Sequence, residues 1–237
     1  MFNLFSKTHR VVGLDIKSGY IRFVEIVRTL AEDHVHSYGE IVPEEEVIRN
    51  GEIVNEQKLV TYLHDIKKNF KSRTAIISLP DGANSRIYHD VLRKAGIKPH
   101  AFVSVDMALV QSLVPKGSET SFLLVDAEPE IVNFLTFVAS EKPLLYQGDP
   151  ANHSVISNLN RIYIDWYDIH KEKIHYILFS GSRAKAPEFL DYVARETKLD
   201  LKRANVLVNL TLNTEKVPIL PREDSYKYAV AIGLTLS

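Results

Sequence analysis

The sequence predicts an α/β protein built from two similar subdomains, and three observations support this. Each half of the chain opens with three strand-like segments and continues with alternating helix and strand patterns. The polar, turn-rich segment "KGSETS" separates the halves at residues 116–121. The composition, 45% hydrophobic and 25% charged over 237 residues, is typical of a globular protein. We therefore expect subdomains at 1–118 and 119–237, with a ligand cleft between them.

The first half carries alternating or continuous apolar runs of strand type, with amphipathic helices after them. The expected strands are 11–16, 21–26, 35–38, a short one within "RNGEIVN", and "TAIISLP". Asn55 is a helix N-cap, and the helix after it buries Leu59, Leu63, Ile66 and Phe70. Two more helices are expected at 83–95, which stops at Gly96 with Pro99 just beyond, and within "VSVDMALVQSLVP".

The second half repeats this plan. We expect strands at "FLLVDA", "IVNFLTFVA" and "PLLYQ", and then a long helix with Val155, Leu159, Ile162, Trp166 and Ile169 on one face. Strand "HYILFS", helix "PEFLDYVARETK", strand "VLVNL" and a helix through "YKYAVAIGLTL" complete the chain.

Charge and composition exclude several classes of function. A net charge of -1 gives no basic excess for nucleic-acid binding, and the absence of cysteine rules out disulfides and thiolate metal sites. The longest uncharged apolar run, "IVNFLTFVAS", is about half the roughly 20 residues that a membrane helix needs. We found neither signal-peptide features nor a histidine cluster with a carboxylate that predicts a metal site. We expect a cytoplasmic protein without direct membrane insertion.

Three motifs are candidates for a nucleotide site. The hairpin "VVGLDIKSGYIRFVEI" holds Asp15, Lys17 and Ser18 at a turn that can cradle a phosphate. A second hairpin holds Asp126, and the strand–turn–helix segment "ILFSGSRAKAPEFL" holds Gly181 and Ser182. These three motifs, with the closing "AVAIGLTL", resemble those of the actin/heat-shock-protein/sugar-kinase superfamily.

Within that superfamily the chain is most similar to the PilM family of type IV pilus assembly, which is related to FtsA. The similarity lies in "GLDIKSGYIRFVEI", "IRNGEIVNEQKLVTYLHDIKKNF" and "LRKAGIKPHAFVSVDMALVQSL". It implies an actin-like (ribonuclease H-like) fold of two subdomains, with mixed sheets flanked by helices and a reduced inserted subdomain at about 39–85. FtsA-like proteins end in an amphipathic membrane-binding helix, and the ending "GLTLS" favours the PilM-like interpretation.

The departures from the family pattern predict that nucleotide chemistry is lost. Lys17 replaces a glycine whose backbone would approach phosphate, and Pro129 removes one N–H donor. A Glu128 carboxylate ~4 Å from a phosphate charge would cost about 4 kcal/mol at a dielectric of ~20, roughly a thousandfold in affinity. The helical subdomain that completes the family's adenine pocket also has no counterpart. We therefore expect a vestigial site and no bound cofactor, with ATP and Mg²⁺ possible only if the cleft is still competent.

The resemblance also implies a partner. PilM-family proteins bind the extended cytoplasmic tail of a single-span membrane protein, PilN, beside their insert. The corresponding residues here are Ile53, Val54, Leu59, Leu63 and Ile77. Each of them also has a simpler interpretation, as core packing of one helix on one sheet. The expected function is a non-catalytic scaffold of a pilus-like or related secretion apparatus, held at the inner membrane by such a partner. The alternatives are a compact ATPase or kinase and, ranked last, an actin-like filament protein.

Overall fold

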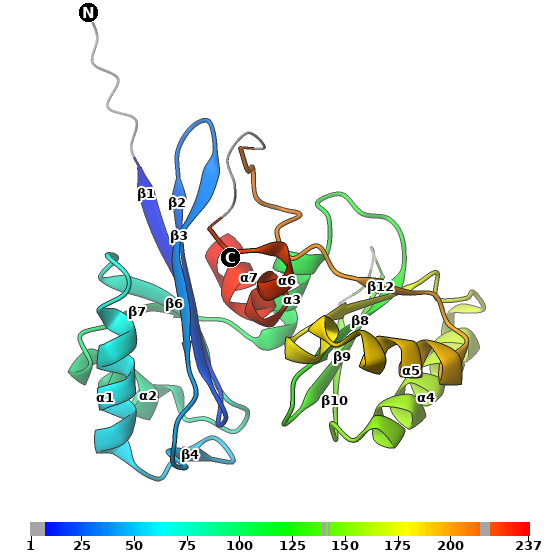
Figure 1. Ribbon diagram of the computed structural model, residues 1–237, viewed down its shortest axis with the longest axis horizontal. Helices are drawn as coiled ribbons and strands as arrows, with labels where there is room; N and C mark the ends of the chain where they lie inside the picture. The colour runs from blue at the N-terminus through cyan, green and yellow to red at the C-terminus, as the bar shows by residue number, and fades with distance from the viewer. Residues whose placement is uncertain (1–7, 139–140, 142, 214–218) are drawn as a thin grey trace, which may run out of the picture. The chain divides into compact units, whose positions relative to one another are not determined.

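A computed structural model describes residues 8–138, 141, 143–213 and 219–237 of the chain (Figure 1). The described residues form two compact units. Unit 1 takes its residues from 1–112, 209–221 and 230–237, and unit 2 from 113–208 and 222–229. We expected a single division at residue 118. In the structure the chain passes to unit 2 at residue 113, and segments 209–221 and 230–237 belong to unit 1 again.

Unit 1 is built on a five-stranded mixed sheet with the order β3-β2-β1-β6-β7. The strands are β1 (His9–Ile16), β2 (Ile21–Arg28), β3 (Asp33–Ile41), β6 (Thr74–Ser78) and β7 (Lys98–Phe102). The first three strands pair antiparallel, and β6 joins β1 in parallel. Helices α1 (Glu56–Lys67) and α2 (Ser85–Lys94) provide the connections that parallel pairing requires.

Helices cover both faces of this sheet (Figure 1). On one face, α1 and α2 bury an apolar core against β1, β2 and β6. Asn55 caps α1 by accepting a hydrogen bond from the Lys58 backbone N–H at 3.2 Å. On the other face lie α3 (Val105–Leu113) and α7 (Ala229–Leu236). A Cβ at Gly13 would collide with the Ala231 carbonyl, so the C-terminal helix lies directly against β1.

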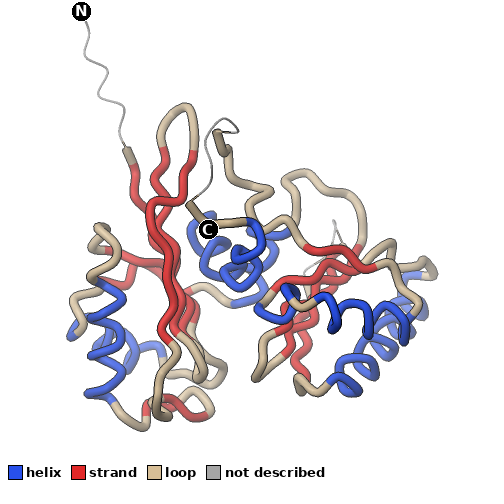
Figure 2. Tube along the Cα trace, viewed as in Figure 1, coloured by secondary structure: helices blue, strands red, loops and turns tan. Residues whose placement is uncertain are grey.

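Unit 2 repeats the sheet order of unit 1, as β10-β9-β8-β11-β12. The strands are β8 (Phe122–Ala127), β9 (Val132–Phe137), β10 (Leu144–Gly148), β11 (Ile177–Ser180) and β12 (Leu201–Arg203). The first three pair antiparallel, and β11 joins β8 in parallel. The helices are α4 (Asn152–His170), η1 (Ser182–Lys185), α5 (Pro187–Thr197), α6 (Arg222–Ser225) and η2 (Tyr226–Tyr228). Figure 2 shows the strand and helix segments of both units.

Most expected elements are present, and three are corrected. Strand β7 was not predicted. It is an edge strand with alternating exposure, and its Pro99 is typical of the end of a helix rather than of a strand. The expected strand at 206–210 is a series of turns, and β12 just before it is the strand. Ile169, expected in the core, is 70% exposed, whereas the other four positions of the α4 stripe are buried.

The segment 39–85, expected to be a reduced insert, mostly belongs to the main layers of unit 1. Its helix α1 packs on the sheet and its strand β6 pairs with β1. The part outside these layers is a small hairpin, β4 (Ile48–Arg49) and β5 (Glu52–Ile53). The Tyr88 hydroxyl on α2 donates to the Gly51 carbonyl at 3.2 Å, which fixes this hairpin on the helices.

Candidate functional site

The hairpin β1–β2 places the first set of candidate residues. Its turn is closed by a hydrogen bond from the Lys17 N–H to the Tyr20 carbonyl at 2.9 Å. Asp15 is 1% exposed and lies opposite Arg22, which is 3% exposed, in the strand register. Residues paired in this way project from the same face of a sheet. The buried carboxylate therefore faces a cation supplied by its own hairpin.

Arg22 is held by further contacts. Its Nε donates to Glu40 Oε1 at 2.6 Å, and its guanidinium lies 3.6 Å from the Tyr20 ring centroid. These contacts fix the guanidinium on the face of β2 that Asp15 shares. The sequence resemblance implied an aspartate that acts through a metal and its waters; in the structure Arg22 lies opposite Asp15 in the strand register.

The two other expected residues of this hairpin are half-buried in its turn. The Lys17 ammonium lies 3.5 Å from the Leu79 carbonyl, at the limit of a hydrogen bond. Ser18 follows in the turn. Ser78, which pairs with Asp15 across the parallel β1–β6 ladder, is fully buried. Its hydroxyl has no hydrogen-bond partner in the described part of the chain. This part of unit 1 therefore has an unused polar atom next to its carboxylate.

In unit 2, Asp126 is satisfied by its neighbours. The Ser180 hydroxyl donates to Asp126 Oδ1 at 2.9 Å, and Asn133 Nδ2 donates to Oδ2 at 3.3 Å. Gln147 Nε2 donates in turn to Asn133 Oδ1 at 3.2 Å. Asp126 is 2% exposed, so its charge is stabilised by a buried network. These three donors are neutral side chains, and they orient the carboxylate.

Glu128 lies in the second hairpin, as expected, and it has a structural role that the sequence did not indicate. We expected its charge to repel phosphate; in the structure it also occupies the donors of the neighbouring turn. Its carboxylate accepts the Ser182 N–H at 3.2 Å and the Ser182 hydroxyl at 2.6 Å, and it is 2% exposed. Backbone N–H groups at such turns are the ones that bind anions. An internal carboxylate therefore takes the place of an external anion at this turn.

Gly181 brings this turn into contact with the second hairpin. It has φ +84°, and a Cβ there would collide with the Ala127 backbone. Only glycine fits this position, so here its role is to let two backbone segments approach. The sequence indicated that Gly181 allows a close approach to the backbone, but it could not show that the Ala127 backbone, and not a ligand, lies there.

Arg183 was not among the expected site residues. Its guanidinium donates to the Pro150 carbonyl and to Asn152 Oδ1, and lies 3.8 Å from the Phe189 ring centroid. Burial lowers the pKa of this guanidinium from its usual value. Arg183 thus joins the start of α4 to the start of α5. Its position after the Gly-Ser pair was visible in the sequence, but its partners lie about 30 positions away.

The expected partner-binding residues do not form a common surface. Leu59, Leu63 and Ile77 are 0% exposed and belong to the core of unit 1. Ile53 packs against that core, and Val54 is 48% exposed. These three buried residues therefore pack in the core and are not accessible to a partner. Val54, at the end of the β4–β5 hairpin, is the position that can meet another molecule.

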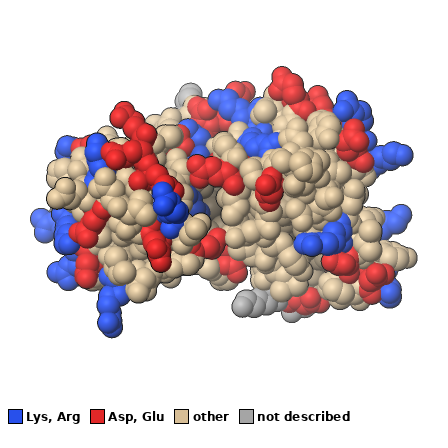
Figure 3. Space-filling view, turned by 90° about the horizontal axis from the view of Figure 1, so that it is seen from below, with Lys and Arg blue, Asp and Glu red and all other residues tan. Residues whose placement is uncertain are grey.

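Charges around the hairpin β4–β5 are mostly paired. Glu45 lies 3.2 Å from Lys58, Glu56 lies 2.5 Å from Lys94, and Glu46 pairs with Arg49. Figure 3 shows acidic and basic side chains together on the face of each unit that it presents. The charges on this face are therefore mixed, and no continuous field of one sign covers it.

Two histidines lie on β3, and one of them is near a buried carboxylate. His36 Nε2 is 3.9 Å from Glu25, and the His34 and His36 rings are 6.5 Å apart. In the described residues, no group of three or more His, Asp or Glu side chains is placed to hold a metal ion. Among the same residues, no helix has the length and apolarity to cross a bilayer.

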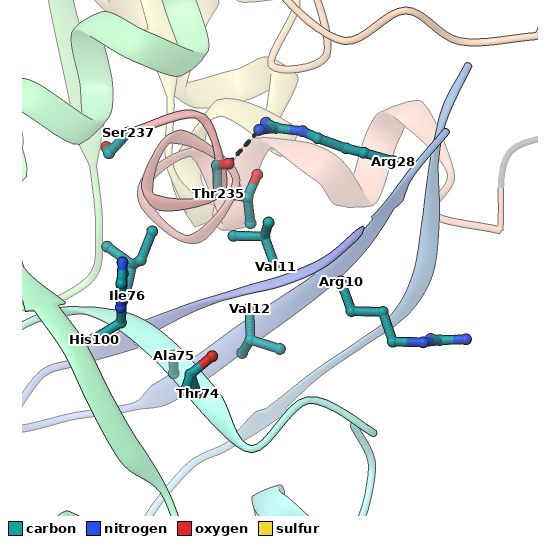
Figure 4. A pocket seen from close by; sticks show the side chains of 10 residues that line it. All are labelled: Arg10, Val11, Val12, Arg28, Thr74, Ala75, Ile76, His100, Thr235 and Ser237. Atoms are coloured by element: carbon teal, nitrogen blue, oxygen red, sulfur yellow. Dashed lines mark hydrogen bonds between the residues drawn. The ribbon is translucent and has the colours of Figure 1, made fainter. Parts of the chain in front are cut away.

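A cavity of about 260 Å³ in unit 1 lies between the sheet and the end of α7 (Figure 4). The two arginines that line it contact other parts of unit 1. Arg28 Nη2 donates to the Thr235 carbonyl at 2.7 Å, and Arg10 points away from the cavity and lies 3.6 Å from Glu25. Because Arg28 binds the end of α7 and Arg10 is turned toward Glu25, the cavity has no pair of guanidinium groups directed at an anion.

No protein-family model and no curated protein sequence matches the chain. Solved structures do match it. A chain of a "PilM-PilN type IV pilus biogenesis complex" aligns with TM-score 0.77 at 11% identity, covering 95% of this chain and 97% of the other. The ethanolamine utilization protein EutJ from Carboxydothermus hydrogenoformans aligns with TM-score 0.67 at 12% identity, covering 96% and 89%. MreB5 of Spiroplasma citri bound to ADP aligns with TM-score 0.55 at 10% identity, covering 95% and 94%.

These similarities establish the fold. The chain has the actin-like ATPase fold, as the sequence motifs predicted, with two sheets of the same strand order flanked by helices. At these identities the likeness is one of fold alone, and the fold carries many functions. Function must therefore be argued from the residues.

Proposed function

We propose that this protein is a scaffold with an actin-like fold that does not hydrolyse nucleotide and that binds the cytoplasmic tail of a PilN-like, single-span membrane protein. It would act in the cytoplasm, held at the inner membrane by that partner, within a type IV pilus-like or related secretion apparatus. The likeness to a PilM chain from a PilM–PilN complex supports this class of partner.

The observation that carries the non-catalytic part is the Glu128–Ser182 contact. A nucleotide phosphate at the Ser182 turn would have to displace a buried carboxylate that already accepts both of its donors. Displacement would leave that carboxylate without its hydrogen bonds and place two anions together, and both effects oppose binding. The residues of unit 2 therefore do not fit a nucleotide phosphate.

The alternative, a compact ATPase or kinase, is favoured by one feature of unit 1. The buried Ser78 hydroxyl next to Asp15 has no hydrogen-bond partner among the described residues, and a hydrated Mg²⁺ could supply one. Against this, Arg22 stands opposite the same carboxylate. A cation there reduces the advantage of adding Mg²⁺.

Titration calorimetry with Mg-ATP separates the two functions. We expect no measurable heat of binding for the wild type at ~1 mM nucleotide, the concentration at which a binding free energy of about -4 kcal/mol would register. Tight binding that is lost in Asp15→Ala would establish the ATPase alternative instead.

The scaffold function is tested by fluorescence anisotropy with a labelled peptide of the cytoplasmic tail of a PilN-like single-span membrane protein from the same organism. We expect saturable binding that Val54→Asp weakens, because Val54 is the exposed member of the expected contact set. Glu52→Gln, a change at an exposed residue of the same hairpin, serves as the control. Absence of binding by the wild-type protein would remove the proposed partner.

A further inference from the structure

A groove on unit 2 has no role in the function proposed above. It has a volume of about 610 Å³ and lies between α5, β12 and the segment around α6. Its lining comprises Leu190, Asp191, Ala194, Leu199, Asp200, Leu201, Arg203, Arg222 and Tyr226. The apolar members lie on α5 and β12 and at Tyr226, and the charged members are exposed. The groove therefore has an apolar floor and a charged rim.

One wall of the groove is a sheet edge. Strand β12 is the last strand in its sheet and pairs, among the described residues, with β11 alone. Its outer edge presents backbone donors and acceptors to which another extended segment can pair. Leu201 and Arg203 alternate with Lys202, so both project from the same face of the strand and both line the groove. A segment added at this edge could pair through its backbone and pack its side chains on the floor.

The charges are divided between the two ends of the groove. Arg203 is at the end of β12 that reaches η1, where its Nε donates to the Ala184 carbonyl at 3.0 Å. Arg222 begins α6, and Lys185 pairs with Asp224 of α6 at 2.8 Å. Two arginines therefore stand at this end. In the described part of the chain, neither of them makes an ion pair.

The opposite end of the groove differs in charge. Asp200, just before β12, lies 3.4 Å from Lys202, and Asp191 is exposed on the rim formed by α5. Arginine binds carboxylates through paired N–H donors, so the arginine end selects an anion and the aspartate end disfavours one. At the arginine end, Lys185 of η1 and Asp224 of α6 also form an exposed ion pair.

We propose that this groove binds the free C-terminus of a partner protein as a short extended segment. Aliphatic side chains of the segment lie on Leu190, Leu199 and Leu201, and its backbone pairs with β12. The terminal carboxylate meets Arg203 and Arg222. This is a second interaction surface, on a different unit from the hairpin that carries Val54, and it does not depend on the identity of the membrane partner.

The test uses the full chain and fluorescent short peptides whose terminal residues are drawn from valine, leucine, isoleucine and phenylalanine. Each peptide is compared as a free acid and as a C-terminal amide. We expect the best free acids to bind at least about tenfold more tightly than their amides, because the amide loses the charged acceptor. Backbone amide shifts on binding should map to residues 190–203 and 222–226.

Variants identify the residues responsible. Arg203→Gln combined with Arg222→Gln should lower the affinity for the acid to that for the amide and leave amide binding unchanged. Arg195→Gln, which removes one positive charge from α5 outside the groove, should alter neither affinity. Ala194→Phe, which fills the floor, should weaken both.

Three results would overturn the proposal. The first is equal affinity for acids and amides, and the second is amide shifts confined to another part of the chain. The third is absence of binding by every peptide at ~1 mM, which corresponds to a binding free energy weaker than about -4 kcal/mol. Circular dichroism of each variant confirms that a loss of binding does not reflect unfolding. The Mg-ATP titration does not involve this groove, so failure here leaves the proposed function intact.

Discussion

The two hairpins β1–β2 and β8–β9 are equivalent in register but opposite in charge. The Lys17 N–H bonds the Tyr20 carbonyl and the Glu128 N–H bonds the Ile131 carbonyl, so Lys17 and Glu128 hold the same place in their turns. Each reaches the loop after the adjacent parallel strand. Lys17 approaches the Leu79 carbonyl at 3.5 Å, and Glu128 accepts two hydrogen bonds from Ser182, the shorter being 2.6 Å.

The difference shows how a duplicated strand plan can be fixed locally by different chemistry. In unit 1 the turn side chain is half-buried and its contact is long, whereas in unit 2 the contact is short and is made by a buried carboxylate. Buried, charge-assisted hydrogen bonds stabilise more than long exposed ones. We therefore expect the turn of unit 2 to depend on Glu128 far more than the turn of unit 1 depends on Lys17.

The largest expected effect concerns the central strands. Gly13 on β1 lies against the α7 backbone, while Leu124, at the same place in β8, is a fully buried side chain. Gly13→Val should destabilise unit 1 by about 3 kcal/mol or more, because α7 must move away. Leu124→Val should cost unit 2 about 1 kcal/mol. Native-state hydrogen exchange of β1 and β8 amides resolves the two units, and equal losses would contradict the comparison.

The next effect tests the two turn residues directly. Glu128→Ala leaves the Ser182 N–H and hydroxyl without their acceptor and should cost about 2 kcal/mol. Lys17→Ala should change the free energy of unfolding by less than about 0.5 kcal/mol. Urea unfolding monitored by β8 and β1 amides provides the measurement. Similar costs for the two substitutions would show that the Lys17 contact is stronger than its length indicates.

Much of this fold could be predicted because its elements carry local signals. Asn55 as an N-cap, the α1 stripe and the three opening strands of each half are encoded within a few residues. The missed elements lack such signals. Strand β7 is an edge strand containing Pro99, and the apolar run 206–210 is buried in turns, so its hydrophobicity does not indicate its backbone conformation.

The site was predicted less completely because its partners are distant in sequence. Glu128 meets Ser182 across 54 positions, and Gly13 meets a helix near the end of the chain. Local pattern gave the residue types but not these pairings. It also could not show that Leu59, Leu63 and Ile77 are fully buried, since an amphipathic stripe is the same whether it faces a core or a partner.

A smaller effect distinguishes the two buried serines. Ser180 donates to Asp126, whereas Ser78, at the same place in unit 1, is buried without a hydrogen-bond partner among the described residues. Ser180→Ala should cost about 1 kcal/mol, and Ser78→Ala should be neutral within about 0.5 kcal/mol. Hydrogen exchange of β6 and β11 amides measures the loss of stability in each of the two variants. A clear loss from Ser78→Ala would mean that this hydroxyl is satisfied in solution, by water or by an ion.

The smallest expected effect is a pH dependence confined to unit 1. Glu25 on β2 is fully buried near His36, while the equivalent position in β9 is Thr136. Burial, followed by the positive charge of Arg10, lowers the pKa of His36 below its usual 6.5. The unfolded chain therefore binds the proton more readily than the folded chain does. The stability of unit 1 should fall as the pH drops through the unfolded pKa of about 6.5, until the folded pKa is passed.

His36→Gln isolates this contribution because it removes the titrating ring and keeps a polar side chain. Hydrogen exchange of β1 and β2 amides between about pH 7 and pH 5 should then show a shallower loss of stability than in the wild type. The exposed His153 in unit 2 provides the control, because His153→Gln should leave the profile of unit 1 unchanged. A variant profile that equals the wild type would mean that the His36 pKa is the same in the folded and unfolded chains, and a steeper variant profile would mean that the attraction of Glu25 outweighs burial and Arg10.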